Sequence, residues 1–223
     1  MANVLNDPKL EALLERLHAR SQAQEGDTGA FFRGRAEARE LSWEGFDEAS
    51  HRFMADKLVA LDRDKAEFCY LLCRSLGARR VVECGTSFGV STLYLAAAAR
   101  DNGGGVVIGT EHEPAKAAAA RANFAAAGLT EFIDLREGDL RETLKDVGGP
   151  VDFMLMDIWV EMARPALELV APRLRPGAIV VADNTAQVRG PYGAYFDFIA
   201  DPANGLRTLT LPFAGGLEMT VKC

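Results

Sequence analysis

The chain has 223 residues, a formal net charge of −7, 48% hydrophobic residues and 26% charged residues. This length favours a single α/β domain, and the composition is that of a folded globular protein, which excludes the disordered and low-complexity classes. The acidic balance argues against nucleic acid and anionic membranes as partners, so we expect a small molecule as the ligand.

The first third of the chain has the periodicity of helices, with a patch rich in glycine and aspartate at 25–29 that is expected to end the first of them. We expect these helices to form a cap, residues 1–62, on a core of residues 63–223 within one domain. The N-terminus has no apolar leader and nothing near the about 18 apolar residues of a membrane span, which predicts a cytoplasmic protein. The helices are expected at 8–24, 44–61 and 65–76.

From residue 79 onward, short β-rich runs alternate with helical runs, which predicts βαβ units and a parallel sheet. The last two strand runs are apolar on both faces and therefore belong at the centre of the sheet. Pro176 and Gly177 predict a turn just before the last of them. Parallel strands are expected at 79–84, 106–111, 132–137, 151–157 and 178–183, and helices at 91–100, 114–127, 141–147 and 159–174.

After Asn184 the pattern loosens into an exposed loop, a short helix at 192–200 and a turn rich in proline, asparagine and glycine. Two further strands, 206–213 and 216–222, are expected to pair as an antiparallel hairpin. The predicted fold is therefore a doubly wound, mostly parallel Rossmann-like sheet with a C-terminal hairpin and N-terminal cap helices.

The four cysteines lack the spacing of a zinc site or of a secreted disulfide framework. Cys69 and Cys73 fall one turn apart on an expected helix, which is poor geometry for chelating a metal. We interpret Cys69, Cys73, Cys84 and Cys223 as reduced core thiols rather than as a redox or metal site.

The turn ECGTSFG, residues 83–89, joins the first parallel strand to its helix. Glycines at such a turn let the backbone approach a ligand and expose helix N–H groups to it. The pattern is not the G-x-G-x-x-G of a dinucleotide site, so a dinucleotide is disfavoured. Glu111 ends the second strand, where α/β nucleotide folds bind ribose hydroxyls. An ordinary turn with a surface acid is the structural alternative.

These residues resemble a known family. VVECGTSFGVSTLYLA, VIGTEHEPAKAAAARANFAAAGL and REGD are similar to the S-adenosylmethionine site of class I methyltransferases. FMLMDIWVEMARPALELVAPRLRPGAIVVADN resembles the catechol and caffeoyl-coenzyme A type O-methyltransferases, in particular their small bacterial members, and the resemblance extends from about Phe53 to the end of the chain. It implies a cofactor site at Glu83, Gly85, Thr86, Ser87, Gly89, Glu111, His112, Gly138, Asp139 and Asp157.

The same resemblance implies a divalent cation, Mg²⁺ or another, bound by Asp157, Asp183 and Asn184, with Asp157 as the catalytic residue. Two of the expected strands end at these residues, and hard oxygen ligands suit Mg²⁺. A strand-end turn and a helix cap are the structural alternatives. Trp159 is expected to form a wall of the acceptor pocket or, equally, to be a packed core side chain.

The sequence departs from the family at one position. Members carry a lysine three residues beyond the first metal aspartate, where it is taken as the general base, and Val160 stands there in this chain. Metal acidification with water, another side chain, or a changed or lost activity would each account for this. Glu161 and Arg164 lie on the same helix, and position alone assigns neither of them a role.

The leading hypothesis is a methyltransferase that methylates a hydroxyl of a catechol-like molecule with the help of a metal. The alternatives are a metal-independent methyltransferase, a nucleotide-dependent dehydrogenase and a non-catalytic protein that binds S-adenosylmethionine. His18 and His51 lie on amphipathic helices and are left out of the site as solvated or interfacial residues. The aromatic cluster at 31–35 with Trp43 suits either the acceptor cavity or a subunit interface, and a homodimer is expected.

Overall fold

The structure is a computed structural model that describes residues 4–40, 47–186 and 190–223. Its centre is one seven-stranded sheet in the order β3-β2-β1-β4-β5-β7-β6. The first five strands are parallel, and β7 pairs antiparallel with both β5 and β6. This confirms the predicted doubly wound sheet with a C-terminal hairpin. The strands are β1 (Arg80–Cys84), β2 (Val106–Glu111), β3 (Ile133–Glu137), β4 (Val151–Met156), β5 (Leu174–Asp183), β6 (Leu206–Leu211) and β7 (Leu217–Lys222).

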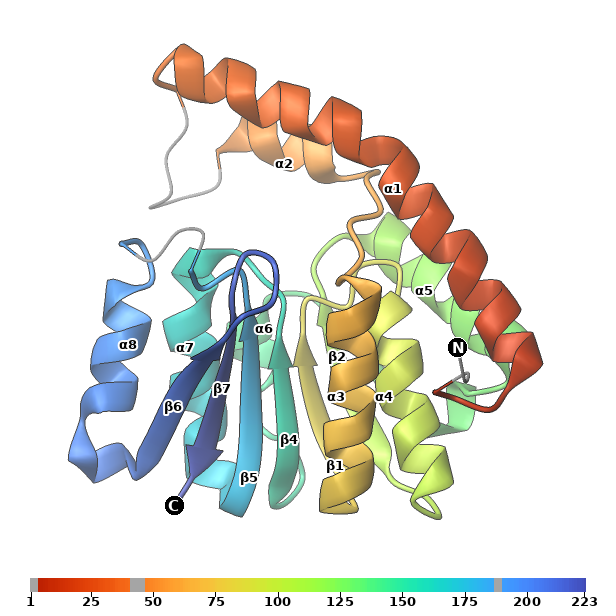
Figure 1. The fold of residues 1–223 in the computed structure, drawn as a ribbon, viewed down its shortest axis with the longest axis vertical. Coiled ribbons are helices and arrows are strands. Elements are labelled where there is room, and N and C mark those ends of the chain that lie inside the picture. Colours follow the sequence, from red (N-terminus) through yellow and green to blue (C-terminus); the bar gives the residue numbers. More distant parts are fainter. Residues whose placement is uncertain (1–3, 41–46, 187–189) are drawn as a thin grey trace.

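Helices cover both faces of the sheet (Figure 1). Side chains of the strands alternate between the two cores that result. On β1, for example, Val81 packs into one core and Val82 into the other. One core is closed by α3 (Arg63–Leu76), α4 (Val90–Asp101), α5 (Pro114–Ala127) and the first half of α1. The other is closed by α6 (Leu140–Thr143), α7 (Val160–Val170) and α8 (Gly193–Ala200).

The N-terminal helices differ from the prediction. A single helix, α1 (Pro8–Glu37), runs straight through the patch at 25–29 where a break was expected. Each glycine there costs a helix about 1 kcal/mol, but contacts with the returning chain offset this. Gln24 Oε1 accepts the Leu58 N–H at 2.9 Å, and the rings of Phe31 and Phe53 stack with centroids 3.8 Å apart. Local propensity therefore predicted a boundary that tertiary contacts remove.

The second expected helix, 44–61, is shorter in the structure, unlike the first. It is reduced to α2 (Glu48–Met54), where Asp47 caps the first turn, while residues 44–46 lie outside the described part of the chain. Together, α2 and the second half of α1 lie beyond the carboxyl ends of the parallel strands (Figure 1). The cap therefore stands over the edge of the sheet where ligands of such folds bind.

The Pro176–Gly177 pair lies inside β5, not in a turn before it. The pairing between β4 and β5 shifts register between Val151 and Phe153, and Gly177 adopts a φ of +78°. The strand therefore continues through an irregularity, because a proline and a left-handed glycine interrupt the ladder without ending the strand.

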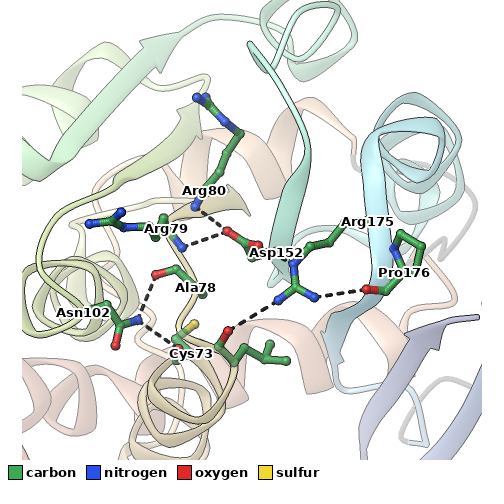
Figure 2. Close-up of polar contacts among 9 residues, drawn as sticks. Cys73, Ala78, Arg79, Arg80, Asn102, Asp152, Arg175 and Pro176 are labelled. Atoms are coloured by element: carbon green, nitrogen blue, oxygen red, sulfur yellow. Dashed lines mark hydrogen bonds and ion pairs between the residues drawn. The ribbon is translucent and has the colours of Figure 1, made fainter.

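Asp152 joins three strands at the amino edge of the sheet (Figure 2). Its Oδ2 accepts the backbone N–H groups of Arg79 and Arg80, each at 2.8 Å, and its Oδ1 accepts Nε–H of Arg175 at 2.5 Å. The Arg175 guanidinium also donates to the carbonyls of Leu76 and Pro176. One carboxylate on β4 thus fixes the starts of β1 and β5.

Asp152→Ala is expected to destabilise the protein by about 3 kcal/mol, because it leaves the partly buried backbone N–H of Arg80, the exposed N–H of Arg79 and one guanidinium without their acceptor. Thermal unfolding should show a midpoint lower by about 6–12 °C. Asp134→Ala is the matched control, because Asp134 pairs with Arg136 on the exposed edge strand β3 and should shift the midpoint far less. Equal shifts in the two variants would contradict a central role for Asp152.

Two expectations on single side chains are resolved by burial. Cys69, Cys73 and Cys84 are free and buried, and burial raises the pKa of each thiol, which agrees with inert core thiols. Cys223 is free but exposed, so the prediction of a core thiol is wrong there. His18 is not solvated: it is 7% exposed and its Nε2 lies 3.2 Å from the Tyr94 hydroxyl.

In the described part of the chain, no helix combines the length and the apolar character needed to cross a bilayer.

Candidate active site

A cavity of about 440 Å³ lies at the carboxyl edge of the parallel strands, beneath the cap. Residues of the predicted cofactor site and of the predicted metal site both line it, from the turn after β1 to the residue after β5. A second hollow, of about 480 Å³, lies around Arg79, Arg80 and Asp152, whose polar groups already bond to the protein itself. We therefore place the site in the first cavity. Its lining includes Gly85, Ser87, Glu111, His112, Gly138, Asp139, Asp157, Trp159 and Asn184.

The turn after β1 requires its two glycines for different reasons. Gly85 has a φ of +93°, and a Cβ added there would lie 2.1 Å from the carbonyl oxygen of Asp157. Gly89 has a φ of +81°, and its added Cβ would lie 2.3 Å from the ring of Phe124. Between them, Ser87 adopts a φ of +50°. The turn therefore packs against the end of β4 on one side and α5 on the other, and Gly85 and Ser87 line the cavity.

Glu83, Thr86 and Gly89 do not line the cavity. The Glu83 side chain is completely buried beneath the turn, where Ser91 Oγ donates to it at 2.7 Å and the hydroxyls of Thr86 and Thr92 donate as well. Burial raises the pKa of Glu83, and these hydrogen bonds oppose the rise. The structure thus makes Glu83 an organiser of the turn, one layer behind the cavity wall.

Glu111 faces the cavity with its carboxylate already oriented. Its Oε2 accepts the backbone N–H of Ser87 at 2.7 Å, and its Oε1 accepts that of Glu113 at 2.8 Å. Each oxygen keeps a lone pair for a ligand hydroxyl. The hydroxyl of Ser87 is buried and has no hydrogen-bond partner among the residues that the structure describes. A carboxylate and an unpaired hydroxyl therefore converge on one wall.

The loop after β3 completes this wall. Gly138 has a φ of +124°, and Asp139 caps α6 by accepting the Arg141 N–H at 2.9 Å. The hydrogen bond from the Arg141 side chain lowers the pKa of Asp139 to about 2. His112 is an exposed part of the lining. The structure thus brings the predicted residues of β2 and β3 together with those of β1.

Asp157 directly follows β4, and Asp183 is the last residue of the adjacent strand β5. Asp157 is partly buried and lines the cavity, whereas Asp183 is 6% exposed. Desolvation, and then the negative charge of Asp183, raise the pKa of Asp157 well above its usual range. Asn184 follows with a φ of +58°, and its Nδ2 donates to Asp183 Oδ2 at 3.1 Å. The three predicted oxygen ligands therefore meet at one point of the sheet edge.

A lysine in the first turn of α3 contacts this acidic pair. Lys65 Nζ lies 2.8 Å from Asp183 Oδ1 and 3.0 Å from Asp62 Oδ2, and its side chain is 2% exposed. Burial alone would lower the pKa of Lys65, but the hydrogen bond and charge of Asp183, followed by those of Asp62, raise it. The ammonium is therefore a fixed positive charge behind the acidic pair.

The far wall of the cavity is apolar and comes from the cap and α7. Trp159 is 37% exposed, and its ring centroid lies 6.3 Å from that of Phe32 on α1. Val160 begins α7 and packs toward the core beneath it, so no side-chain base stands at that position. The remaining lining on this side includes His51, Met54, Val59, Glu161 and Met162.

Sequence reasoning missed two of these residues. His51 was left out of the site, but α2 places it in the cavity lining. Lys65 was not considered, although a signal was present: it lies four residues before Cys69 and eight before Cys73, on the buried face of α3. A lysine on an apolar helix stripe requires a buried partner. Trp43, the other aromatic residue considered for this wall, lies outside the described residues.

Comparison with known proteins agrees with this geometry. A family model described as a methyltransferase domain matches residues 82–185. A catechol O-methyltransferase of Mycobacterium tuberculosis is 32% identical over 154 residues, which cover 69% of this chain and 68% of that protein. A catechol O-methyltransferase of Niastella koreensis is 32% identical over 134 residues, 56% of this chain and 58% of that protein.

A solved structure is similar over most of the fold. The O-methyltransferase from Bacillus cereus, determined in complex with SAH, superposes with a TM-score of 0.67 at 25% identity and covers 74% of this chain and 83% of its own. The sheet order, the cavity at its carboxyl edge and the relatives point to one assignment. The chain belongs to the S-adenosylmethionine-dependent O-methyltransferases of the catechol and caffeoyl-coenzyme A O-methyltransferase type.

Proposed function

We propose that this O-methyltransferase methylates a hydroxyl of a catechol-like small molecule, with a divalent cation held by Asp157, Asp183 and Asn184. One observation carries the proposal: Asp157 and Asp183 lie at the ends of adjacent strands, and Asp157 and Asn184 line the cavity that Glu111 also faces. The catechol O-methyltransferases of M. tuberculosis and N. koreensis support this substrate class.

The wall formed by the turns after β1, β2 and β3 suits S-adenosylmethionine. Glu111 is held by two backbone N–H groups in an orientation that can accept from two ribose hydroxyls. The unpaired Ser87 hydroxyl and the backbone between Gly85 and Gly89 would bind the amino acid end, and Gly138 with Asp139 would border the adenine. The cofactor supplies a methyl group on a sulfonium ion, which the negative charge of this wall favours.

The acidic pair suits a divalent cation. Asp157 and Asp183 offer hard oxygen atoms, and Asn184 offers a third through its amide. Desolvation, followed by the negative charge of Asp183, raises the pKa of Asp157, and the charge of Lys65 opposes the rise. When both carboxylates are ionised, negative charge is in excess at this point. A cation that both carboxylates can reach would remove this imbalance, so the residues fit the metal.

Methyl transfer then depends on how these side chains hold the reactants. A divalent cation, when bound, lowers the pKa of a hydroxyl that coordinates it. Asp157 ends β4 beside the Gly85 turn, so the acceptor and the methyl donor would be held side by side. Trp159 and the apolar cap residues would pack against the acceptor ring and exclude water. Holding both groups at attack distance accounts for much of the rate.

The test is a calorimetric titration of Mg²⁺ into protein saturated with S-adenosylhomocysteine. Saturable binding is expected in the wild type, and Asn184→Gly is expected to weaken it by about 10-fold or more, because it removes one ligand and keeps the left-handed backbone. The affinity for S-adenosylhomocysteine is the folding control. Absence of Mg²⁺ binding in the wild type, with a catechol present, would remove the metal from the proposal.

A metal-independent methyltransferase is the second candidate, and Val160 favours it. With no lysine at this position, the acceptor of such an enzyme would need a hydroxyl that ionises easily. Methyl transfer that persists in a strong chelator would support this alternative. The homodimer and the cytoplasmic location stay predictions, and sedimentation at micromolar concentration would decide the first.

A further inference from the structure

Lys65 stands behind the acidic pair in an environment that is costly for a lysine. It lies in the first turn of α3, where a positive charge opposes the helix dipole, and burial removes it from water. Two carboxylates compensate for this cost: Asp183 at 2.8 Å and Asp62 at 3.0 Å. Asp62 is the N-cap residue of α3, yet its side chain makes no capping hydrogen bond. Its carboxylate forms an ion pair with the Lys65 ammonium instead.

We propose that Lys65 is a positioning residue of the metal site: it holds Asp183 through Oδ1 and leaves Oδ2, which also accepts from the Asn184 amide, for the cation. This inference rests on the proposed function. Lys65 is not part of the cavity lining, so it acts through Asp183 and not on the substrate. Asp183 is held from three sides, because Lys65 donates to Oδ1, Asn184 donates to Oδ2, and the Tyr192 hydroxyl donates to the backbone carbonyl at 3.2 Å.

The charges at this point match a divalent cation. Lys65 and Asp62 cancel each other, and Asp157 with Asp183 leaves a formal charge of −2. The ammonium therefore orients its carboxylate without making the site repel a metal. Outer residues of this kind, which hydrogen bond to a ligating side chain, typically contribute about 10–100-fold to metal affinity.

The experiment measures Mg²⁺ affinity by calorimetry in protein saturated with S-adenosylhomocysteine. Lys65→Met is expected to weaken Mg²⁺ binding by about 10–100-fold, and Lys65→Arg to restore part of the loss. Lys57→Met is the matched control, because Lys57 pairs with Asp56 outside the cavity and its removal changes the net charge equally. Its Mg²⁺ affinity is expected to equal that of the wild type.

The outcomes separate this inference from the proposed function. Wild-type binding with an unchanged or tighter affinity in Lys65→Met would overturn the role of Lys65 and leave the metal site standing. No Mg²⁺ binding in the wild type would overturn both. A purely structural lysine would lower the thermal midpoint of Lys65→Met without changing the Mg²⁺ affinity of the folded protein.

A further variant covers the case in which Lys65→Met does not fold, which loss of S-adenosylhomocysteine binding would reveal. Asp62→Asn keeps a good N-cap residue and removes the outer charge from the ammonium. Because Asp62 is 55% exposed, its loss is expected to weaken Mg²⁺ binding only by about 2–5-fold. Unchanged or tighter binding in Asp62→Asn would contradict the charge balance on which the proposal depends.

Discussion

Gly85→Ala is expected to abolish useful cofactor binding, with a loss of about 100-fold or more in affinity for S-adenosylhomocysteine. The added Cβ would lie 2.1 Å from the Asp157 carbonyl oxygen, and both atoms belong to the framework of the site. The turn must therefore move by about 1 Å, a displacement that costs an active site about 100-fold. The left-handed backbone at a φ of +93° adds strain for any residue with a Cβ. Calorimetry measures the affinity directly.

The matched control is Gly77→Ala at the end of α3. Gly77 also has a positive φ, +58°, but nothing lies within 4 Å of an added Cβ. This variant should lose about 1 kcal/mol of stability and keep its affinity for S-adenosylhomocysteine. If Gly85→Ala binds S-adenosylhomocysteine as well as Gly77→Ala does, the contact between the turn and β4 does not shape the cofactor site.

The core of the fold could be predicted because its signals are local. The five parallel strands, the hairpin and their helices follow from alternation of β-rich and alanine-rich runs. Pro114 at the first position of α5 and Gly128 with a φ of +70° after its end are start and stop signals that the structure keeps. Such signals depend on backbone geometry within a few residues, so a single sequence contains them.

The cap could not be predicted to the same degree because its contacts are distant in sequence. The glycines at 25–29 argue for a helix end, and only the return of the chain at Phe53 and Leu58 shows why α1 continues. His51 was left out of the site for the same reason, because periodicity can place it on a helix but cannot show that this helix lies over a cavity. Contacts between segments more than 20 residues apart leave no local pattern.

The residues of the site also divide into those that local sequence signals predicted and those that only distant contacts bring together. The ends of β4 and β5 predicted where Asp157 and Asp183 would meet, because parallel strands end at one edge. The contact between Lys65 and Asp183 joins residues 118 positions apart and follows from no motif that we identified. Glu83 had the opposite outcome: its place beside the glycine turn suggested a ligand contact, whereas hydrogen bonds from three hydroxyls keep it inside the protein.

Asp157→Asn should have opposite effects on activity and on stability. Methyl transfer is expected to fall by about 1,000-fold, since a bound cation that loses an anionic ligand loses several kcal/mol of charge stabilisation. Mg²⁺ binding should be lost with it. The protein without ligands, in contrast, should become more stable at alkaline pH, because the variant removes a charge that the folded state disfavours.

The pH dependence of that gain has a definite sign. Desolvation and the charge of Asp183 raise the pKa of Asp157 to about 8 from its usual 3.8, so the folded wild type binds more protons than the unfolded chain between these values. Wild-type stability due to this group therefore falls as pH rises from about 4 to about 8. The asparagine variant has no such loss, so its advantage in thermal midpoint should grow over this range and then level off.

Asp139→Asn is the control for this experiment, because Asp139 also lines the cavity but has a pKa lowered to about 2 by Arg141. That variant should be no more stable than the wild type at any pH above about 4. A stability gain in Asp157→Asn that disappears when Mg²⁺ is added to the wild type would link the two effects, since the cation offsets the same charge. A pH-independent difference between Asp157→Asn and the wild type would instead mean that packing, and not the repulsion between Asp157 and Asp183, limits stability at this site. An advantage that grows with pH, as expected, would mean that the ionised site carries an unfavourable charge that a ligand has to neutralise, which is the physical reason to expect a cation there.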